Sequence, residues 1–148
     1  MRLARRLSRH GGFDMSDFNP DDISTFPDEG VVVNPITCWQ RMDQQAKRKT
    51  LQEAIEVLRE YDEAEVRDAV ELYVDALVYP KDAVSAIRRD DNHVTEDWYD
   101  GQIVNYLVGR LMAIRLVSRR ANGYGWVREY ADQRTCELVE TKHREDCR

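Results

Sequence analysis

The sequence lacks an apolar run long enough to cross a membrane. A membrane-spanning helix needs about 20 predominantly apolar residues, and Arg110 and Arg115 interrupt the only candidate, the stretch from Trp98 to Arg120. No glycine-rich phosphate-binding loop is present either, because Gly123-Tyr124-Gly125 has the pattern of a helix junction. We therefore expect a protein without a membrane segment and without a nucleotide-binding loop.

Cysteine is scarce, which argues against a disulfide framework. The three cysteines are an odd number, and the N-terminus lacks the apolar stretch of a secretory signal, so a reducing cytoplasm is the expected location. Cys136, His143 and Cys147 would lie nearly in line on a helix, but about 10 Å of helical rise separates the first two. His143 and Cys147 could form half of a metal site without an obvious second pair, and we predict no metal and no cofactor.

Lysine is also rare, with four residues beside eighteen arginines, and acidic residues exceed basic ones by 28 to 22. Residues 1–14 carry four arginines and one aspartate, so the remainder is more acidic than the net charge of -6 suggests. Non-specific binding to nucleic acid depends on neutralising phosphates. The composition therefore makes nucleic acid an unexpected partner.

Helix signals dominate what is present, and strand signals are absent apart from Val31–Val33. Capping residues and apolar spacing predict helices over about 35–49, 50–61, 62–79, 80–90, 95–120 and 125–142. The acidic segment before Asn34 contains Pro20, Pro27 and Gly30 and reads as a disordered or extended arm, which could lie on the body through Phe18 and Phe26. The prediction is an all-α, single-domain bundle of five or six helices, 35–148, preceded by an arm, 1–34.

The helix predicted over 95–120 is apolar on nearly every side, so we expect neighbouring helices to bury it. Arg110 and Arg115 would lie beside apolar residues of this helix. One interpretation is that their guanidinium groups bind a carboxylate or phosphate ligand, and the other is that they pair with acidic side chains of neighbouring helices. Both arginines are our candidate ligand-binding residues, and the pairing interpretation is favoured.

An enzymatic alternative comes from two pairs of acidic residues. Glu53 and Glu56, followed by Glu71 and Asp75, resemble the magnesium-binding carboxylates of the all-α NTP pyrophosphohydrolases, whose pattern is ExxE, a spacer and ExxD. The resemblance implies a magnesium-dependent nucleotide hydrolase. However, the second pair has the spacing ExxxD, and all four side chains are predicted to face solvent rather than to converge on a metal.

No arrangement of residues predicts nucleophilic catalysis, since no Ser or Cys motif accompanies the histidines, and we predict no catalytic residues. A helix-turn-helix protein that reads DNA with the helix around Trp126 is a second alternative. The favoured prediction is a small acidic module for protein–protein interaction or self-association. Exposed aromatic side chains are its candidate anchors, unless they simply close the core: Trp39, Trp98, Tyr99, Tyr124 and Trp126.

Overall fold

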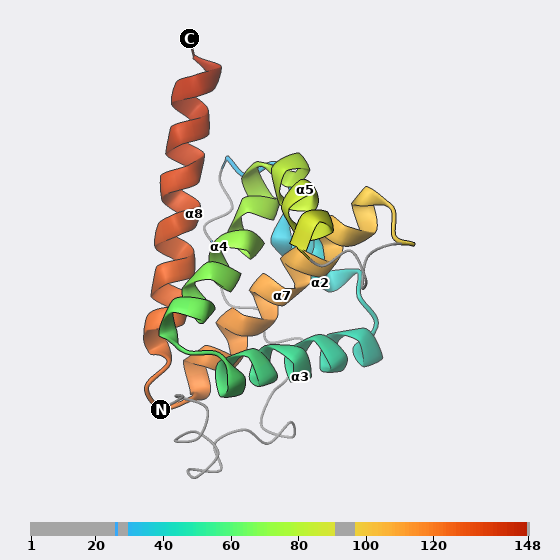
Figure 1. The fold of residues 1–148 in the computed structure, drawn as a ribbon, viewed down its shortest axis with the longest axis vertical. Coiled ribbons are helices and arrows are strands. Elements are labelled where there is room, and N and C mark those ends of the chain that lie inside the picture. The colour runs from blue at the N-terminus through green and yellow to red at the C-terminus, as the bar shows by residue number, and fades with distance from the viewer. Residues whose placement is uncertain (1–25, 27–29, 91–96, 148) are drawn as a thin grey trace.

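The computed structural model describes residue 26 and residues 30–90 and 97–147, and in these ranges the protein is all-α. Six helices pack into a single compact domain, as predicted (Figure 1). They are α2 (Pro35–Gln40), α3 (Gln44–Glu60), α4 (Glu63–Val78), α5 (Pro80–Asp90), α7 (Asp100–Arg120) and α8 (Gly125–Asp146).

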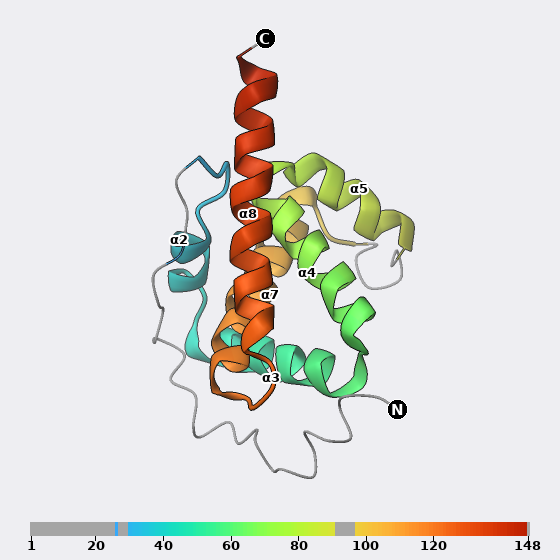
Figure 2. The ribbon, with the colours of Figure 1, turned by 90° about the vertical axis from the view of Figure 1, so that its left-hand side faces the viewer.

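Helix α7 is the central member of the bundle, which confirms the prediction from its apolar girdle. It packs against each of the other five helices. Every residue from Leu111 to Ser118 is buried, so this half of α7 is covered on all sides. Figures 1 and 2 show α3 crossing one end of α7 while α4 and α8 run along it.

The predicted boundary between the first two helices is wrong. The Asn34 side chain caps α2 as expected, accepting from the Thr37 N–H at 3.0 Å. Helix α2 nevertheless ends at Gln40, and Asp43 caps α3 by accepting from the Ala46 N–H at 2.7 Å. Thr50 is therefore not a cap but lies inside α3, where its hydroxyl donates to the Ala46 carbonyl. The basic cluster at 47–49, interpreted as a helix end, lies within α3 as well.

Several other boundaries are confirmed. Asp62 and Glu65 form the predicted capping box of α4, and Pro80 opens α5. Gly123 has a φ of 85°, a left-handed conformation that suits glycine, in the turn between α7 and α8. Helix α7 begins at Asp100, five residues after the predicted cap Thr95, which lies outside the described residues.

The described part of the predicted arm packs onto the helices. Phe26 is buried, and Val31 and Val33 pack against the core. The backbone N–H groups of Val32 and Val33 donate to the Leu77 carbonyl in the last turn of α4, at 2.8 and 3.1 Å. This segment forms no strand, and the rest of the arm, including Phe18, lies outside the described residues.

Candidate functional site

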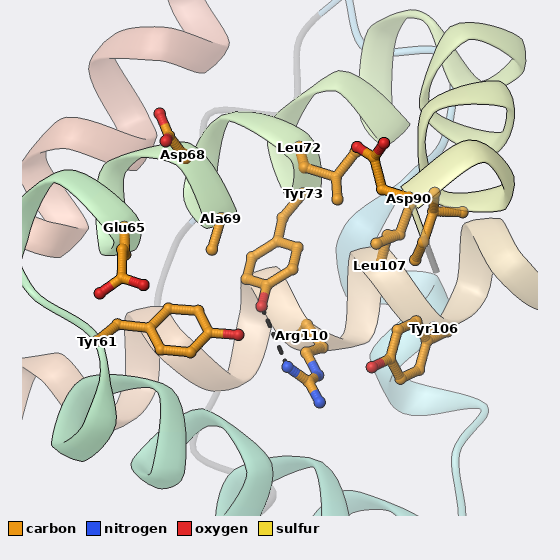
Figure 3. A pocket seen from close by; sticks show the side chains of 11 residues that line it. Tyr61, Glu65, Asp68, Ala69, Leu72, Tyr73, Asp90, Tyr106, Leu107 and Arg110 are labelled. Atoms are coloured by element: carbon orange, nitrogen blue, oxygen red, sulfur yellow. Dashed lines mark hydrogen bonds between the residues drawn. The ribbon is translucent and has the colours of Figure 1, made fainter. Parts of the chain in front are cut away.

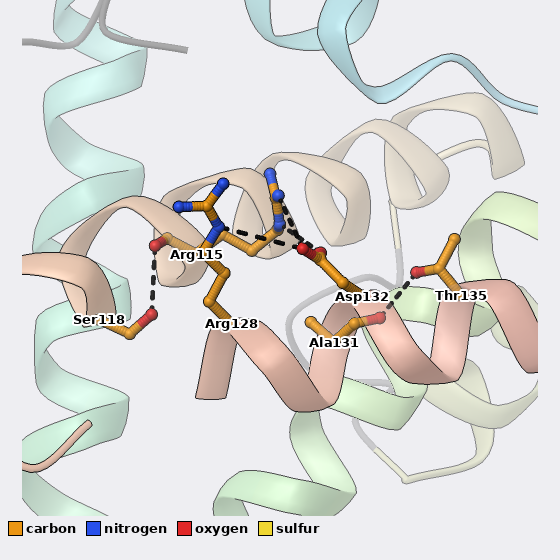
Figure 4. Close-up of polar contacts among 6 residues, drawn as sticks. All are labelled: Arg115, Ser118, Arg128, Ala131, Asp132 and Thr135. Carbon is orange, nitrogen blue, oxygen red and sulfur yellow. Dashed lines mark hydrogen bonds and ion pairs between the residues drawn. The ribbon is translucent and has the colours of Figure 1, made fainter. Parts of the chain in front are cut away.

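Arg115, one of the two predicted ligand-binding arginines, ends on a carboxylate of the neighbouring helix. Its side chain is only 2% exposed. The Arg115 Nε and Nη2 donate to the two carboxylate oxygens of Asp132 on α8, at 2.8 and 3.2 Å. Arg128 approaches the same carboxylate at 3.9 Å (Figure 4). This bidentate pair links α7 to α8 and favours the structural interpretation of Arg115.

An aromatic ring covers the same guanidinium. The Phe26 ring centroid lies 4.4 Å from the Arg115 Cζ, so the chain before the first helix closes this site. Burial lowers the pKa of Arg115, whereas the hydrogen bond and the charge of Asp132 raise it. The arrangement uses the guanidinium to link α7 to α8.

Arg110 lies one and a half turns earlier on α7 in a different setting. Its side chain is 16% exposed, and its Nη2 donates to Glu53 of α3 at 3.1 Å. Its Nη1 donates to the Tyr73 hydroxyl at 3.2 Å, and its Cζ lies 5.0 Å from the Tyr106 ring centroid. Burial opposes the charge on Arg110, but Tyr73, Tyr106 and Glu53 together raise its pKa. Arg110 thus carries a positive charge that is already engaged by the chain.

A surface pocket of about 450 Å³ lies beside Arg110, bounded by the end of α3 and by α4, α5 and α7. Figure 3 shows the Tyr73 hydroxyl directed at the Arg110 guanidinium inside it. Three tyrosines form much of the lining, of which Tyr73 is buried, Tyr106 half-buried and Tyr61 exposed. Aliphatic side chains complete the lining: Ala69, Leu72, Ile87 and Leu107.

Carboxylates surround this pocket. Glu65, Asp68 and Asp90 all line it, and all three are exposed. Arg110 is the one basic residue among the described residues of the lining, and it pairs with Glu53. A pocket with an acidic rim and aromatic walls disfavours phosphate and favours a cation, which tyrosine rings attract and carboxylates pair with.

The predicted aromatic anchors divide into three groups. Tyr99 is 69% exposed, and its neighbour Trp98 stacks edge-on against the pocket residue Tyr106 at 5.3 Å between ring centroids. The expected exposure of Trp39 and Tyr124 is wrong, because both are buried in the core. Trp126 is half-buried under Arg67, whose Cζ lies 4.7 Å from the centroid of the Trp126 ring.

The four carboxylates of the enzymatic alternative do not converge. Glu53 pairs with Arg110 on α7, and Glu71 lies 3.4 Å from Arg134 on α8. Asp75 is half-buried, so of the four only Glu56 is exposed as predicted. Within the described ranges, no three potential metal ligands of one chain cluster together. The charges that resemble the hydrolase pattern instead hold α3 and α4 to their neighbours.

The sequence did not identify Tyr61 and Tyr73 as pocket residues. Tyr73 sits in the apolar stripe of α4, where its ring packs like any core residue. The signal that could have found it is chemical, since a buried tyrosine hydroxyl needs a partner and Arg110 is a partly buried donor on the neighbouring helix α7. Tyr61 follows the last turn of α3, where only the tertiary structure shows which way it points.

Comparisons with known proteins add no functional information. No family model matches the chain, and searches of curated proteins and of solved structures found no similar protein. Among the helices the structure describes, none combines the length and apolar character needed to span a bilayer. The site geometry therefore carries the functional argument.

Proposed function

We propose that this protein is an acidic, non-catalytic interaction module whose pocket between α4, α5 and α7 binds a basic side chain of a protein partner. The observation that carries the proposal is the pocket lining, which combines three tyrosines with three exposed carboxylates. Its single arginine is paired with Glu53 and Tyr73. A lysine or arginine entering the pocket would meet aromatic faces and unlike charge at the same time.

The surface beside the pocket supports binding of a peptide segment rather than of a small cation alone. Tyr99 is the most exposed of the large hydrophobic residues described, and Trp98 connects it to the pocket through Tyr106. Tyrosine and tryptophan contribute strongly to interface energy. We infer that a partner places its basic residue in the pocket and rests neighbouring side chains on Tyr99.

Three free cysteines support a reducing location such as the cytoplasm as part of this proposal. The DNA-binding alternative gains no support at this pocket, because its carboxylates would repel phosphate. The hydrolase alternative gains none either, since its carboxylates pair with arginines of different helices.

The test is a positional-scanning library of fluorescent peptides bound to the full chain. The proposal expects selection of lysine or arginine at one position. For a selected peptide, Asp68→Lys should weaken binding about tenfold, which corresponds to about 1.4 kcal/mol. Glu129→Lys makes the same change of charge at an exposed position on α8, away from the pocket, and should change the affinity less than about twofold.

Three results would contradict the proposal. The library could select no basic residue, or it could select acidic ones, which would make Arg110 an anion-binding residue. Equal weakening by Asp68→Lys and Glu129→Lys would assign the binding to overall charge rather than to the pocket. Fluorescence anisotropy at two salt concentrations distinguishes binding through overall charge from binding in the pocket. Salt screens long-range attraction, so binding through overall charge should weaken more as the salt concentration rises.

A further inference from the structure

The C-terminal half of α8 presents a line of potential metal ligands on a face that no other helix covers. Cys136, Glu140, His143 and Cys147 are all exposed. At about 100° per residue they fall within roughly 60° of one another around the helix axis. Figures 1 and 2 show that this end of α8 projects beyond the other helices. The four side chains therefore form one accessible stripe.

The stripe consists of two pairs with a spacing of four residues, which is one helical turn. In the second pair, Cys147 Sγ and His143 Nε2 lie 3.8 Å apart. Zinc bond lengths of about 2.3 Å to sulfur and 2.0–2.1 Å to nitrogen place two tetrahedral ligands about 3.6 Å apart. This pair is thus already close to the geometry of two zinc ligands, and Cys136 with Glu140 repeats its spacing.

The described residues of one copy do not complete such a site. Tetrahedral zinc takes four ligands, and each pair supplies two. About 10 Å of helical rise separates Cys136 from His143, so the two pairs of one helix cannot share an ion. In agreement, the part of the chain that the structure describes contains no cluster of three potential ligands.

A second copy running antiparallel along the stripe supplies the missing pair. One register sets Cys136 opposite Cys147 of the partner subunit. The same register sets Glu140 opposite His143 of the partner subunit, because residues 136 and 147, like residues 140 and 143, lie equally far on either side of the point between residues 141 and 142. The same two-fold axis generates an equivalent second site. Each site then has two thiolates, one imidazole and one carboxylate, a ligand set that suits zinc.

The shape of the molecule permits this arrangement. The last turns of α8 project beyond the other helices (Figure 2), whereas Leu138 and Val139, inside the paired segment, still pack against the core. With the two helices antiparallel, the two helical bodies would lie toward opposite ends of the helix pair. Polar residues make up the stripe, so little apolar surface is available to drive the pairing. The metal must then supply the association energy, and the dimer should depend on it.

We propose that α8 is a zinc-dependent dimerisation site in which each of two zinc ions binds Cys136 and Glu140 of one copy and His143 and Cys147 of the partner subunit. This inference is independent of the proposed pocket function, since the pocket lining includes no residue of α8. Either proposal can fail without the other.

The first experiment adds zinc chloride to metal-stripped full chain in a phosphine reductant that keeps the thiols reduced. Sedimentation velocity should show the 17.4 kDa chain converting to a dimer with one zinc per chain, and a chelator should reverse it. Cobalt chloride in place of zinc should give the visible bands of a tetrahedral thiolate site. A chain that stays monomeric with zinc, or a dimer that forms without metal, would overturn the proposal.

The decisive experiment mixes two variants that each keep one pair. Cys136→Ser/Glu140→Gln keeps the second pair, and His143→Ala/Cys147→Ser keeps the first. Each variant alone should remain monomeric with zinc, whereas the mixture should form a heterodimer with one zinc ion instead of two. Circular dichroism checks that both variants fold, and Cys38→Ser, which removes the thiol outside α8, should behave like the natural chain. Failure of the mixture to dimerise while the natural chain does would exclude the antiparallel register.

Discussion

Arg115 and Arg110 stand on the same helix, yet their surroundings are opposite. Arg115 is 2% exposed, holds one carboxylate with two hydrogen bonds and lies under Phe26. Arg110 is 16% exposed, divides its donors between Glu53 and Tyr73, and borders a pocket. Two similar residues of one helix therefore differ in their surroundings, one in the contact with α8 and one at the edge of a pocket.

The difference comes from what each arginine faces. Arg115 points at α8, which packs directly on α7. Arg110 points into the region where α3, α4 and α5 diverge, and the gap between them remains open as a pocket. Removing a partner should therefore cost more at Arg115, whose side chain is 2% exposed, than at Arg110, whose side chain is 16% exposed.

The largest effect is expected for Asp132→Ala, which leaves the Arg115 charge buried without its carboxylate. The free energy of unfolding should fall by about 4 kcal/mol, because the Arg115 guanidinium is 2% exposed, although the Asp132 side chain is 31% exposed. Urea denaturation measures it. Arg115→Met/Asp132→Leu, which removes both charges and keeps the volume, should cost clearly less than the single variant. A double variant as unstable as Asp132→Ala would show that packing, and not the stranded charge, dominates at this site.

A somewhat smaller effect is expected for Phe26→Ala, which opens the Arg115 site to water. Loss of a buried ring costs about 3 kcal/mol in a core. Thermal and urea unfolding should show this decrease in the free energy of unfolding. In the variant, Arg115 should be accessible to solvent, as Arg110 is. Val32→Ala is the matched control from the same segment, because Val32 is exposed and should change stability by less than about 0.5 kcal/mol. An equally small change for Phe26→Ala would mean that Phe26 does not close the site in solution.

At the open site, Glu53→Ala should lower the free energy of unfolding by only about 1–2 kcal/mol. Arg110 keeps its hydrogen bond to Tyr73, and water in the pocket can replace the carboxylate. Glu56→Ala, which truncates an exposed glutamate three residues later on α3, should change stability by less than about 0.5 kcal/mol. If Glu53→Ala were as destabilising as Asp132→Ala, the contrast between the two arginines would not hold.

The sequence predicted those parts of the fold that depend on near neighbours along the chain. The Asp62–Glu65 capping box, Pro80 and Gly123 act over at most four residues, so their helix ends could be assigned. The break at residues 41–43 was missed because the basic cluster at 47–49 imitates the end of a helix.

The candidate site could be predicted only in part, because it depends on how the helices are rotated against one another. The sequence indicated that Arg110 and Arg115 need carboxylates, but their partners lie 57 and 17 residues away. Many acidic residues could have served equally well. The pocket joins side chains from residues 61 to 110, and no local pattern shows that Tyr61, Tyr73 and Tyr106 would meet there.

The smallest effect on stability is expected at Asp75, a half-buried carboxylate whose burial is only partly offset by the charge of Arg134. Partial burial raises the pKa of Asp75, with Glu71 and Asp82 adding to the effect and Arg134 opposing it. The folded protein therefore binds the proton more tightly than the unfolded chain does. Asp75 lowers stability above its folded pKa, and this cost disappears as the pH falls below the unfolded value of 3.8.

Asp75→Asn should accordingly raise the free energy of unfolding near neutral pH, by less than about 1 kcal/mol. The gain over the natural chain should shrink as the pH falls from neutral toward 3.8, because the raised pKa makes the natural side chain neutral at a higher pH in the folded state than in the unfolded chain. Urea denaturation at several pH values measures the difference. Asp68→Asn, on the exposed side of the same helix, controls for the change in net charge. A loss of stability in Asp75→Asn at neutral pH would mean that attraction to Arg134 outweighs the burial of Asp75, and that pairing, as at Arg115, governs this carboxylate too.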